Sequence, residues 1–284
     1  MAALNGFTNG FNGVTVTLQN PPLSGSYANN SYAVQATIQQ QVTASFINIV
    51  HPGAFTMQGQ AVQAAQSVNL SPYYNVDAIV MDGSYIASGK GLDGNAFGIP
   101  AKTFSQVRNQ NPSLWTCPGL VSWRGFLFLI CPPSRATNSS NATNNGVLNS
   151  TITLPSGKFS QMLVLATTGY GPSPNNVNYV VTYTDGSTLS ATRNMSDWVV
   201  PQSNNSNEYQ VLAVPYRVAG GYSTGGGLFS GGTTSQYPNT TYFYGYVINL
   251  DNTKTVKTLK PPQSGPGTAG MTMRPIMLAI NLIP

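Results

Sequence analysis

Charged side chains are scarce in this sequence. They make up 7% of its 284 residues, against about 25% in an ordinary soluble domain. A polar but nearly uncharged surface gives little electrostatic repulsion between copies, so it suits a protein that packs against itself or works in acid outside the cell. The composition argues against an ordinary cytosolic enzyme and favours an extracellular, cell-surface or virion protein.

Basic residues outnumber acidic ones by 12 to 7, for a net charge of +5, but they form no dense patch. The only regular series is Lys254, Lys257 and Lys260. Three phosphate contacts would give a weak, salt-sensitive affinity. We interpret the series as a solvated strand end and expect no nucleic-acid partner.

Cysteine and histidine are nearly absent, with two cysteines and the single histidine His51. Two thiols and one imidazole do not supply the four ligands of a zinc site, so we expect no metal and no cofactor. Cys117 and Cys131 flank the run PGLVSWRGFLFLI. In an oxidising compartment we predict a disulfide between them, worth about 3 kcal/mol of stability. Two buried free thiols are the alternative.

Long apolar runs are also missing, because none reaches the roughly 18 residues of a membrane helix. The start, MAALNGFTNGFNG, lacks the charged and apolar segments of a signal peptide. We expect no membrane insertion, and either a removed signal or another exit route such as a virus particle. The predicted glycosylation sites, Asn138, Asn141 and Asn149, are sequons in the loop-like run SRATNSSNATNNGVLNST.

Short strand-like runs separated by Gly, Pro and Asn turns fill the chain from residue 71 to residue 284. They include AIVM, FLFLIC, QMLVLAT, TYFYGYVI and IMLAINL. Asp185-Gly186 between the alternating runs NYVVTY and TLSAT is a strong hairpin signal. The pattern predicts an all-β fold, a jelly-roll β-sandwich with long loops at 132–150 and 219–239.

Residues 1–70 differ from the rest and predict a strand-rich N-terminal extension. Apolar residues alternate with Gln and Thr between Tyr32 and Phe46, which favours one long strand, or a hairpin broken near Gln39 to Gln41, over a helix. The apolar face needs a partner, and we predict a subunit contact. Its members are Val34, Ile38, Val42 and Phe46. The alternative is that these strands belong to the chain's own sandwich.

A family resemblance covers Tyr73 to Pro284. The successive runs YYNVDAI, GLDGNAFGIPA, TLPSGKFSQMLVLATTG, VTYTDGST, SDW, FYGYVINLDNTKTVKTL and IMLAINL resemble the galactose-binding-like, carbohydrate-binding β-sandwich module of secreted proteins. The resemblance implies a jelly-roll sandwich and sugar binding. It implies no catalysis.

The sequence contains no complete catalytic set, so we predict that the protein is not an enzyme. Gly221 to Gly225 matches G-x-S-x-G, but the only histidine lies upstream. Gly89, Gly91 and Gly94 match G-x-G-x-x-G, but Gly98 and Pro100 follow where a phosphate-binding helix would begin. The seven acidic residues lie mostly beside Gly or Asn, as turn residues do.

Aromatic residues suit both sugar sites and protein interfaces. The predicted exposed glycan-binding candidates are Trp198, Tyr216, Tyr222 and Tyr237, with core packing as the alternative for Trp198. Our leading interpretation is a non-enzymatic structural subunit of an extracellular or virion assembly, whose partners are other copies of itself. The alternative is a secreted glycan-binding module or lectin.

Overall fold

The fold is all-β in the computed structural model, which describes residues 8–19, 21–25, 28, 33–42, 55–80, 86, 89–101, 119–130, 144–171, 175–201, 207–219, 235–267 and 270–284. These residues form strands, turns and one short 3-10 helix, η3 (Ser71–Tyr73). None of their helices is long and apolar enough to cross a membrane. The chain divides into two compact units, residues 1–66 and 67–284.

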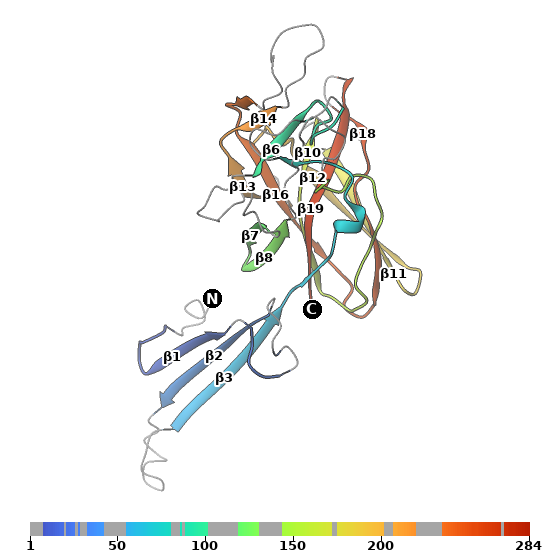
Figure 1. Cartoon of the computed structure of the whole chain (residues 1–284). Helices are drawn as coiled ribbons and strands as arrows, with labels where there is room; N and C mark the ends of the chain where they lie inside the picture. The colour runs from blue at the N-terminus through green and yellow to red at the C-terminus, as the bar shows by residue number, and fades with distance from the viewer. Residues whose placement is uncertain are drawn as a thin grey trace. The chain divides into compact units, whose positions relative to one another are not determined.

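The first unit contains a three-stranded antiparallel sheet in the order β1-β2-β3 (Figure 1). Its strands are β1 (Val14–Gln19), β2 (Ala33–Val42) and β3 (Phe55–Ala64). Strand β2 runs unbroken through Gln39 to Gln41, so the long-strand prediction is confirmed and the helix and broken-hairpin alternatives are wrong. Within the described residues these strands pair only with one another and with no strand of the sandwich.

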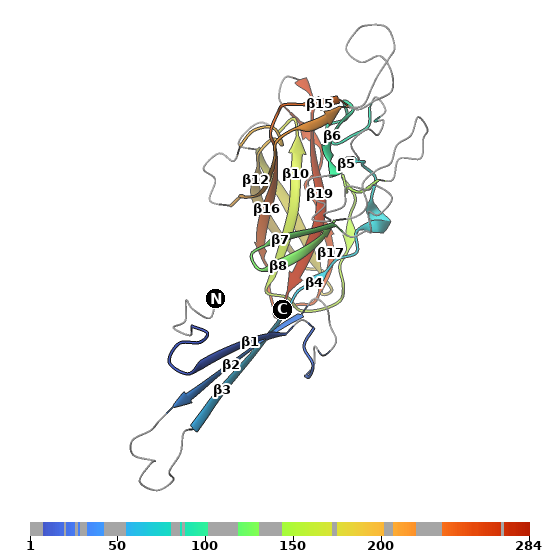
Figure 2. The same cartoon turned by 60° about the vertical axis from the view of Figure 1, so that its left-hand side comes forward.

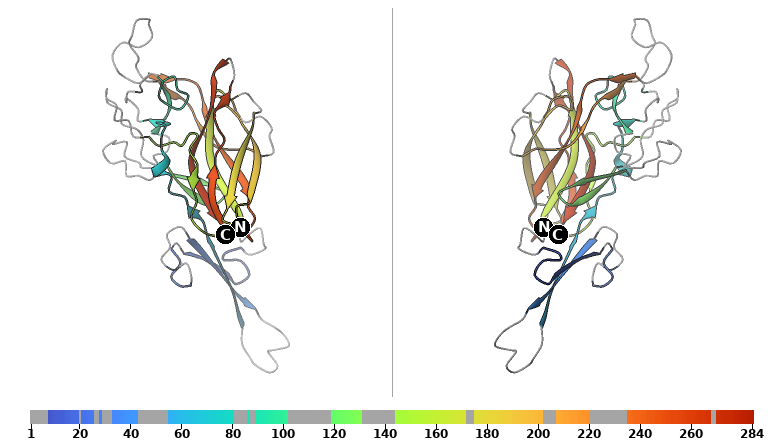
Figure 3. Two further views of the ribbon diagram at one scale, coloured as in Figure 1. Left: turned by 90° about the vertical axis from the view of Figure 1, so that its right-hand side faces the viewer. Right: turned by 90° about the vertical axis from the view of Figure 1, so that its left-hand side faces the viewer.

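The second unit is a sandwich of two sheets, shown from further directions in Figures 2 and 3. One sheet has the order β4-β19-β10-β16, with β13 and β18 added at its margins, and the other has the order β9-β17-β11-β12. The first sheet consists of β4 (Gln66–Ser67), β10 (Gln161–Gly169), β13 (Tyr209–Val214), β16 (Thr241–Asn249), β18 (Gly265–Pro266) and β19 (Thr272–Ile283). The second consists of β9 (Ile152–Thr153), β11 (Asn175–Tyr183), β12 (Thr188–Met195) and β17 (Val256–Lys260).

This strand order is that of a jelly roll, so the fold prediction is confirmed. The eight core strands, taken along the chain, are β4, β9, β10, β11, β12, β16, β17 and β19. One sheet then contains the first, eighth, third and sixth, and the other the second, seventh, fourth and fifth. The chain crosses between the sheets at nearly every connection, which produces two interlocking Greek keys.

One cluster of buried side chains joins the two sheets. Strand β10 contributes Met162 and Val164, and strand β11 contributes Tyr179 and Val181. The predicted hairpin is confirmed: Val181 pairs with Leu189, and the amide of Tyr183 donates to the carbonyl of Ser187 at 2.9 Å. Alternation therefore placed these apolar side chains on the face that the opposite sheet covers.

A hairpin inserted between β4 and β9 covers the outer face of the larger sheet. It consists of β7 (Gly119–Trp123) and β8 (Phe126–Ile130), and in Figure 2 it lies across β10, β16 and β19. The side-chain amide of Asn281 donates to the carbonyl of Leu127 at 2.9 Å. Leu165 and Phe243 are fully buried although they alternate with the core residues of their strands. The hairpin gives the sandwich a partial third layer.

Segments predicted as long loops contain ordered contacts. In the first, Val147 is buried and bridges to Met277 of β19. In the second, β15 (Ser235–Tyr237) pairs with β14 (Arg217–Ala219) in a small sheet that also contains β6 (Phe97–Pro100) and β5 (Ile79–Val80). This small sheet forms part of the wall of the site described next.

Candidate functional site

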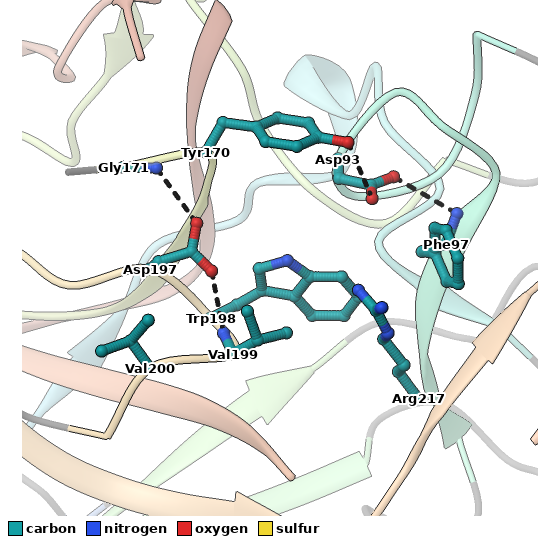
Figure 4. A pocket seen from close by; sticks show the side chains of 9 residues that line it. All are labelled: Asp93, Phe97, Tyr170, Gly171, Asp197, Trp198, Val199, Val200 and Arg217. Atoms are coloured by element: carbon teal, nitrogen blue, oxygen red, sulfur yellow. Dashed lines mark hydrogen bonds between the residues drawn. The ribbon is translucent and has the colours of Figure 1, made fainter. Parts of the chain in front are cut away.

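A pocket of about 470 Å³ lies where strands β6, β10, β12 and β14 begin or end (Figure 4). Three aromatic rings, two carboxyl groups, one guanidinium group and two valines line it. These residues are Asp93, Phe97, Tyr170, Gly171, Asp197, Trp198, Val199, Val200 and Arg217. The volume falls within the range of about 300–1,000 Å³ that is common for small-molecule sites.

Trp198 is held in the wall of this pocket by its backbone. Its amide donates to the carbonyl of Thr168 at 2.8 Å, and its carbonyl accepts from the amide of Tyr242 at 2.7 Å. The tryptophan therefore sits between the ends of β10 and β16. It is only 2% exposed, so the prediction of an exposed aromatic is wrong and the core-packing alternative is confirmed. Although it is buried, Trp198 still lines the pocket.

Asp197, next to this tryptophan, is a buried carboxylate with backbone donors. It accepts from the amides of Val199 at 2.9 Å and Gly171 at 3.1 Å. Burial raises the pKa of Asp197 above its ordinary value, and although the backbone amides lower it, the charge of Asp93 adds to the rise. When ionised, a carboxylate in this position is a strong hydrogen-bond acceptor, while burial opposes its ionisation.

Asp93 reaches the same pocket from the loop before β6. Its carboxylate accepts from the amides of Asn95 at 2.8 Å and Phe97 at 3.3 Å. The hydroxyl of Tyr170 points toward Asp93 and donates to it at 3.4 Å (Figure 4). Burial raises the pKa of Asp93, while those amides and the nearby charge of Arg217 lower it. Burial followed by the Asp93 charge raises the pKa of Tyr170 as well, which keeps its hydroxyl protonated.

Arg217 brings a positive charge to the aromatic wall. Its guanidinium carbon lies 4.1 Å from the ring centre of Phe97 and 5.7 Å from that of Trp198. Arg217 begins β14, whose next residue, Val218, pairs with Gly98 of β6. Cation–π contacts of this kind hold the guanidinium group in place. The pocket thus contains both signs of charge.

The other predicted glycan contacts do not gather in this pocket. Tyr216 is half-buried and packs against Val80, Ile86, Ala96 and Val218. Tyr237 lies in β15 opposite Arg217, but its side chain is outside the described residues. Tyr222 also lies outside them.

Several further predictions fall outside the described residues and stay predictions. Both cysteines do so, although the hairpin that they flank pairs Gly119 with Ile130. Among the predicted glycosylation sites, only Asn149 is described, and it is exposed with its side-chain oxygen accepting from the amide of Ser264 at 2.7 Å. The others outside are Asn138, Asn141 and Phe46, as are the side chains of Val34 and Val42.

Acidic residues do occupy turns, as the sequence predicts. Asp93, Asp185, Asp197 and Asp251 each accept a hydrogen bond from the amide two residues ahead. The glycine motif is also structural. Gly91 has a φ of 81°, and a side chain there would come within 2.4 Å of the carbonyl oxygen of Phe97. Among the described residues no group of three His, Cys, Asp or Glu could hold a metal ion.

Tyr170, Arg217 and Phe97 were not singled out as site residues from the sequence. Asp93 and Asp197 were noticed, but only as turn residues. Asp93 and Tyr170 are 77 positions apart, so no spacing rule brings them together. The only sequence signal for this site is the run SDW, because it places an acidic and an aromatic residue side by side.

No protein-family model and no curated protein sequence matches this chain. The resemblance to galactose-binding-like modules therefore stays a prediction.

The buried carboxyl groups predict that the sandwich is most stable at mildly acid pH. Burial raises the pKa of Asp77, Asp93 and Asp197 in the folded state. The folded chain then binds more protons than the unfolded chain at pH values between the ordinary carboxyl pKa, about 3.9, and the raised values. Stability should rise as pH falls from 7 through the raised pKa values, and thermal unfolding between pH 4 and 7 measures it.

Two exposed residues limit this trend at the acid end. Local hydrogen bonds from Ser187 and Thr253 lower the pKa of Asp185 and Asp251 in the folded state. These two carboxylates therefore stabilise the fold above the ordinary carboxyl pKa, and their contribution to stability is lost as the pH falls below it. We expect Asp197→Asn to flatten the slope between pH 4 and 7, and Asp185→Asn to leave it unchanged. A melting temperature that rises steadily from pH 4 to pH 7 would contradict the prediction.

Proposed function

We propose that the protein is a non-enzymatic structural subunit of an extracellular or virion assembly, and that its copies associate through one face of the β1–β3 sheet. The supporting observation is an apolar face on a sheet that has no second layer of strands among the described residues of its own unit. One sheet cannot bury its own apolar face, because a second layer must pack against it.

The register defines this apolar face. Val16 of β1 pairs with Ile38 of β2, which pairs with Gly59 of β3, and paired residues share a face. Leu18 and Met57 belong to the same face by alternation, and they are 69% and 64% exposed. Ile38, a predicted contact residue, is half-buried. Large apolar side chains that are exposed on one side of a sheet are typical of an interaction surface.

The opposite face of the sheet is polar. Thr15 and Thr17 of β1 and Gln58 of β3 are exposed there. The unit is therefore two-sided, and one side has the composition of an interface. Low charge over the whole chain favours contact between copies because little repulsion opposes it.

The sandwich is compatible with the same function. Jelly rolls occur both in viral capsid subunits and in lectins, so the fold is compatible with either candidate. The separate β1–β3 unit, with its apolar face, favours the structural one.

The experiment introduces charge into the apolar face. We expect the wild-type chain to form large species by light scattering and electron microscopy, and the double variant Leu18→Asp, Met57→Asp to stay small. A buried aspartate without a partner would oppose association strongly. The matched control is Thr15→Asp, Thr17→Asp, which adds the same charge to the polar face and should assemble normally.

Circular dichroism should show the same β-sheet content in all three proteins, because the substitutions lie outside the sandwich. A wild-type chain that remains a discrete monomer at every concentration would contradict the proposal and favour the lectin. Normal assembly of the Leu18→Asp, Met57→Asp variant would exclude this face as the contact.

A further inference from the structure

We infer that Met57 is an oxidation site, and that its sulfoxide weakens the contact between copies of the chain. This inference rests on the structural role proposed above and adds a means by which a peroxide regulates it. Its basis is the position of one exposed thioether on the apolar face of the β1–β3 sheet.

The described methionines differ sharply in exposure. Met57 is 64% exposed and Met271 is 45% exposed, whereas the others are buried at 7% or less. The buried ones are Met162, Met195, Met273 and Met277. A peroxide reaches a buried thioether only when the fold opens locally, so Met57 and Met271 should react first.

The surroundings of Met57 keep its side chain accessible. Met57 lies in β3, and the next residue on the same face of that strand is Gly59. No atom lies within 4 Å of the position where a side chain at Gly59 would begin. Leu18, on the same face, is 69% exposed. The accessible thioether therefore lies within the surface that we propose as the contact.

Hydrogen peroxide is the oxidant of the step. A lone pair of the Met57 sulfur attacks one peroxide oxygen, an S–O bond forms, and the O–O bond breaks. The departing hydroxide takes the proton from the transferred oxygen and leaves as water. Sulfur loses two electrons and the peroxide is reduced, so an apolar side chain becomes a polar sulfoxide.

The new oxygen would be buried at the contact between copies. A sulfoxide oxygen is a hydrogen-bond acceptor, and burying it without a donor opposes association. Val16 and Leu18 on the same face offer no side-chain donor, whereas the amide of Gln40, which pairs with Met57, can supply one. Assembly should therefore weaken, and the concentration that gives half-assembly should rise about tenfold.

The first experiment measures where the oxygen is added. The full chain is treated with dilute hydrogen peroxide below its assembly concentration, and peptide mass spectrometry follows each methionine. Met57 and Met271 should become sulfoxides at least about tenfold faster than Met162 and Met195. In assembled samples the rate at Met57 should fall relative to the rate at Met271, because the proposed contact covers Met57 alone of the two.

The second experiment measures assembly by light scattering before and after peroxide treatment, and each protein is compared with its own untreated sample. Assembly of the wild type should weaken on treatment, whereas that of Met57→Leu, which keeps an apolar side chain without the sulfur, should not change. The matched control, Met271→Leu, should remain as sensitive as the wild type. Without any peroxide, Met57→Gln should assemble more weakly than Met57→Leu, because it places a carbonyl oxygen on the apolar face.

Three results would overturn the inference: oxidation of Met57 no faster than that of Met162, normal assembly of a chain whose Met57 is fully oxidised, or an equal loss of assembly in peroxide-treated Met57→Leu. Each of them can occur in a chain that assembles, so each leaves the structural role intact. A wild-type chain that does not assemble before treatment contradicts the structural role itself, and the inference with it. The two failures are therefore distinguishable.

Discussion

Replacing Glu208 by alanine should lower the free energy of unfolding of the sandwich by about 3 to 5 kcal/mol. Glu208 is 1% exposed and precedes β13. Its carboxylate accepts from the amide of Ser196 at 2.8 Å, from the hydroxyl of Ser196 at 2.5 Å and from the hydroxyl of Tyr246 at 2.6 Å. The substitution would leave three buried donors without this acceptor.

The donors cannot find water easily, since Ser196 and Tyr246 are themselves buried. Burial, followed by the charge of Glu208, raises the pKa of Tyr246 well above its ordinary value, so its hydroxyl remains a donor. Each buried donor that loses its partner costs about 1–3 kcal/mol, and these costs are only partly additive. For a unit of this size, the melting temperature should fall by roughly 10 °C.

Two further variants test the cause. Glu208→Gln keeps the size and one acceptor oxygen, so it should destabilise less than alanine. Adding Tyr246→Phe to Glu208→Ala removes one stranded donor, so the double variant should lose less stability than the sum of the single variants. If the free energy of unfolding of Glu208→Ala is within about 0.5 kcal/mol of the wild-type value, the hydrogen bonds around this carboxylate contribute little to stability.

Replacing Gly245 by valine should detach the β7–β8 hairpin from the sandwich and destabilise the second unit by about 3 kcal/mol or more. Gly245 lies in β16, where it pairs with Leu165 of β10 and Tyr209 of β13. A side chain there would come within 2.4 Å of the indole of Trp123. A rigid indole on one side and two hydrogen-bonded neighbours on the other leave little space for relaxation.

The neighbours of Trp123 explain why the loss of stability should extend beyond Gly245 itself. Its ring lies 5.8 Å from that of Phe128 and 6.0 Å from that of Tyr209, and Arg124 lies over Tyr209 at 5.1 Å. Displacing the indole would disturb all these contacts and expose the outer face of the sheet. Chemical denaturation monitored by tryptophan fluorescence measures the loss.

The control for this prediction is Gly59→Ala in β3, where no atom lies within 4 Å of the added carbon. It should change the stability of its own unit by no more than about 0.5 kcal/mol. Trp123→Ala should partly rescue Gly245→Val by removing the obstructing ring. Equal stability of Gly245→Val and the wild type would show that the hairpin is held elsewhere.

The local sequence pattern was sufficient to predict the strands in which apolar and polar residues clearly alternate. The runs NYVVTY and TLSAT become β11 and β12, and the turn between them contains Asp185 and Gly186, whose φ of 84° suits glycine. Strands without that pattern were missed. Strand β6 has the sequence FGIP, and β14 and β15 are three residues each, so their pairing depends on neighbours and not on their own composition.

The sequence by itself determined the all-β class, the N-terminal extension, most of the strands and the apolar face around Ile38, because alternation and turn residues act over a few positions. The tertiary structure alone decided that Trp198 is buried, that Glu208 meets Tyr246, and that Asp93 and Asp197 share a pocket with Arg217. Those contacts join residues that are tens of positions apart. They depend on which strands the jelly roll places side by side and on how their side chains fill the space between them.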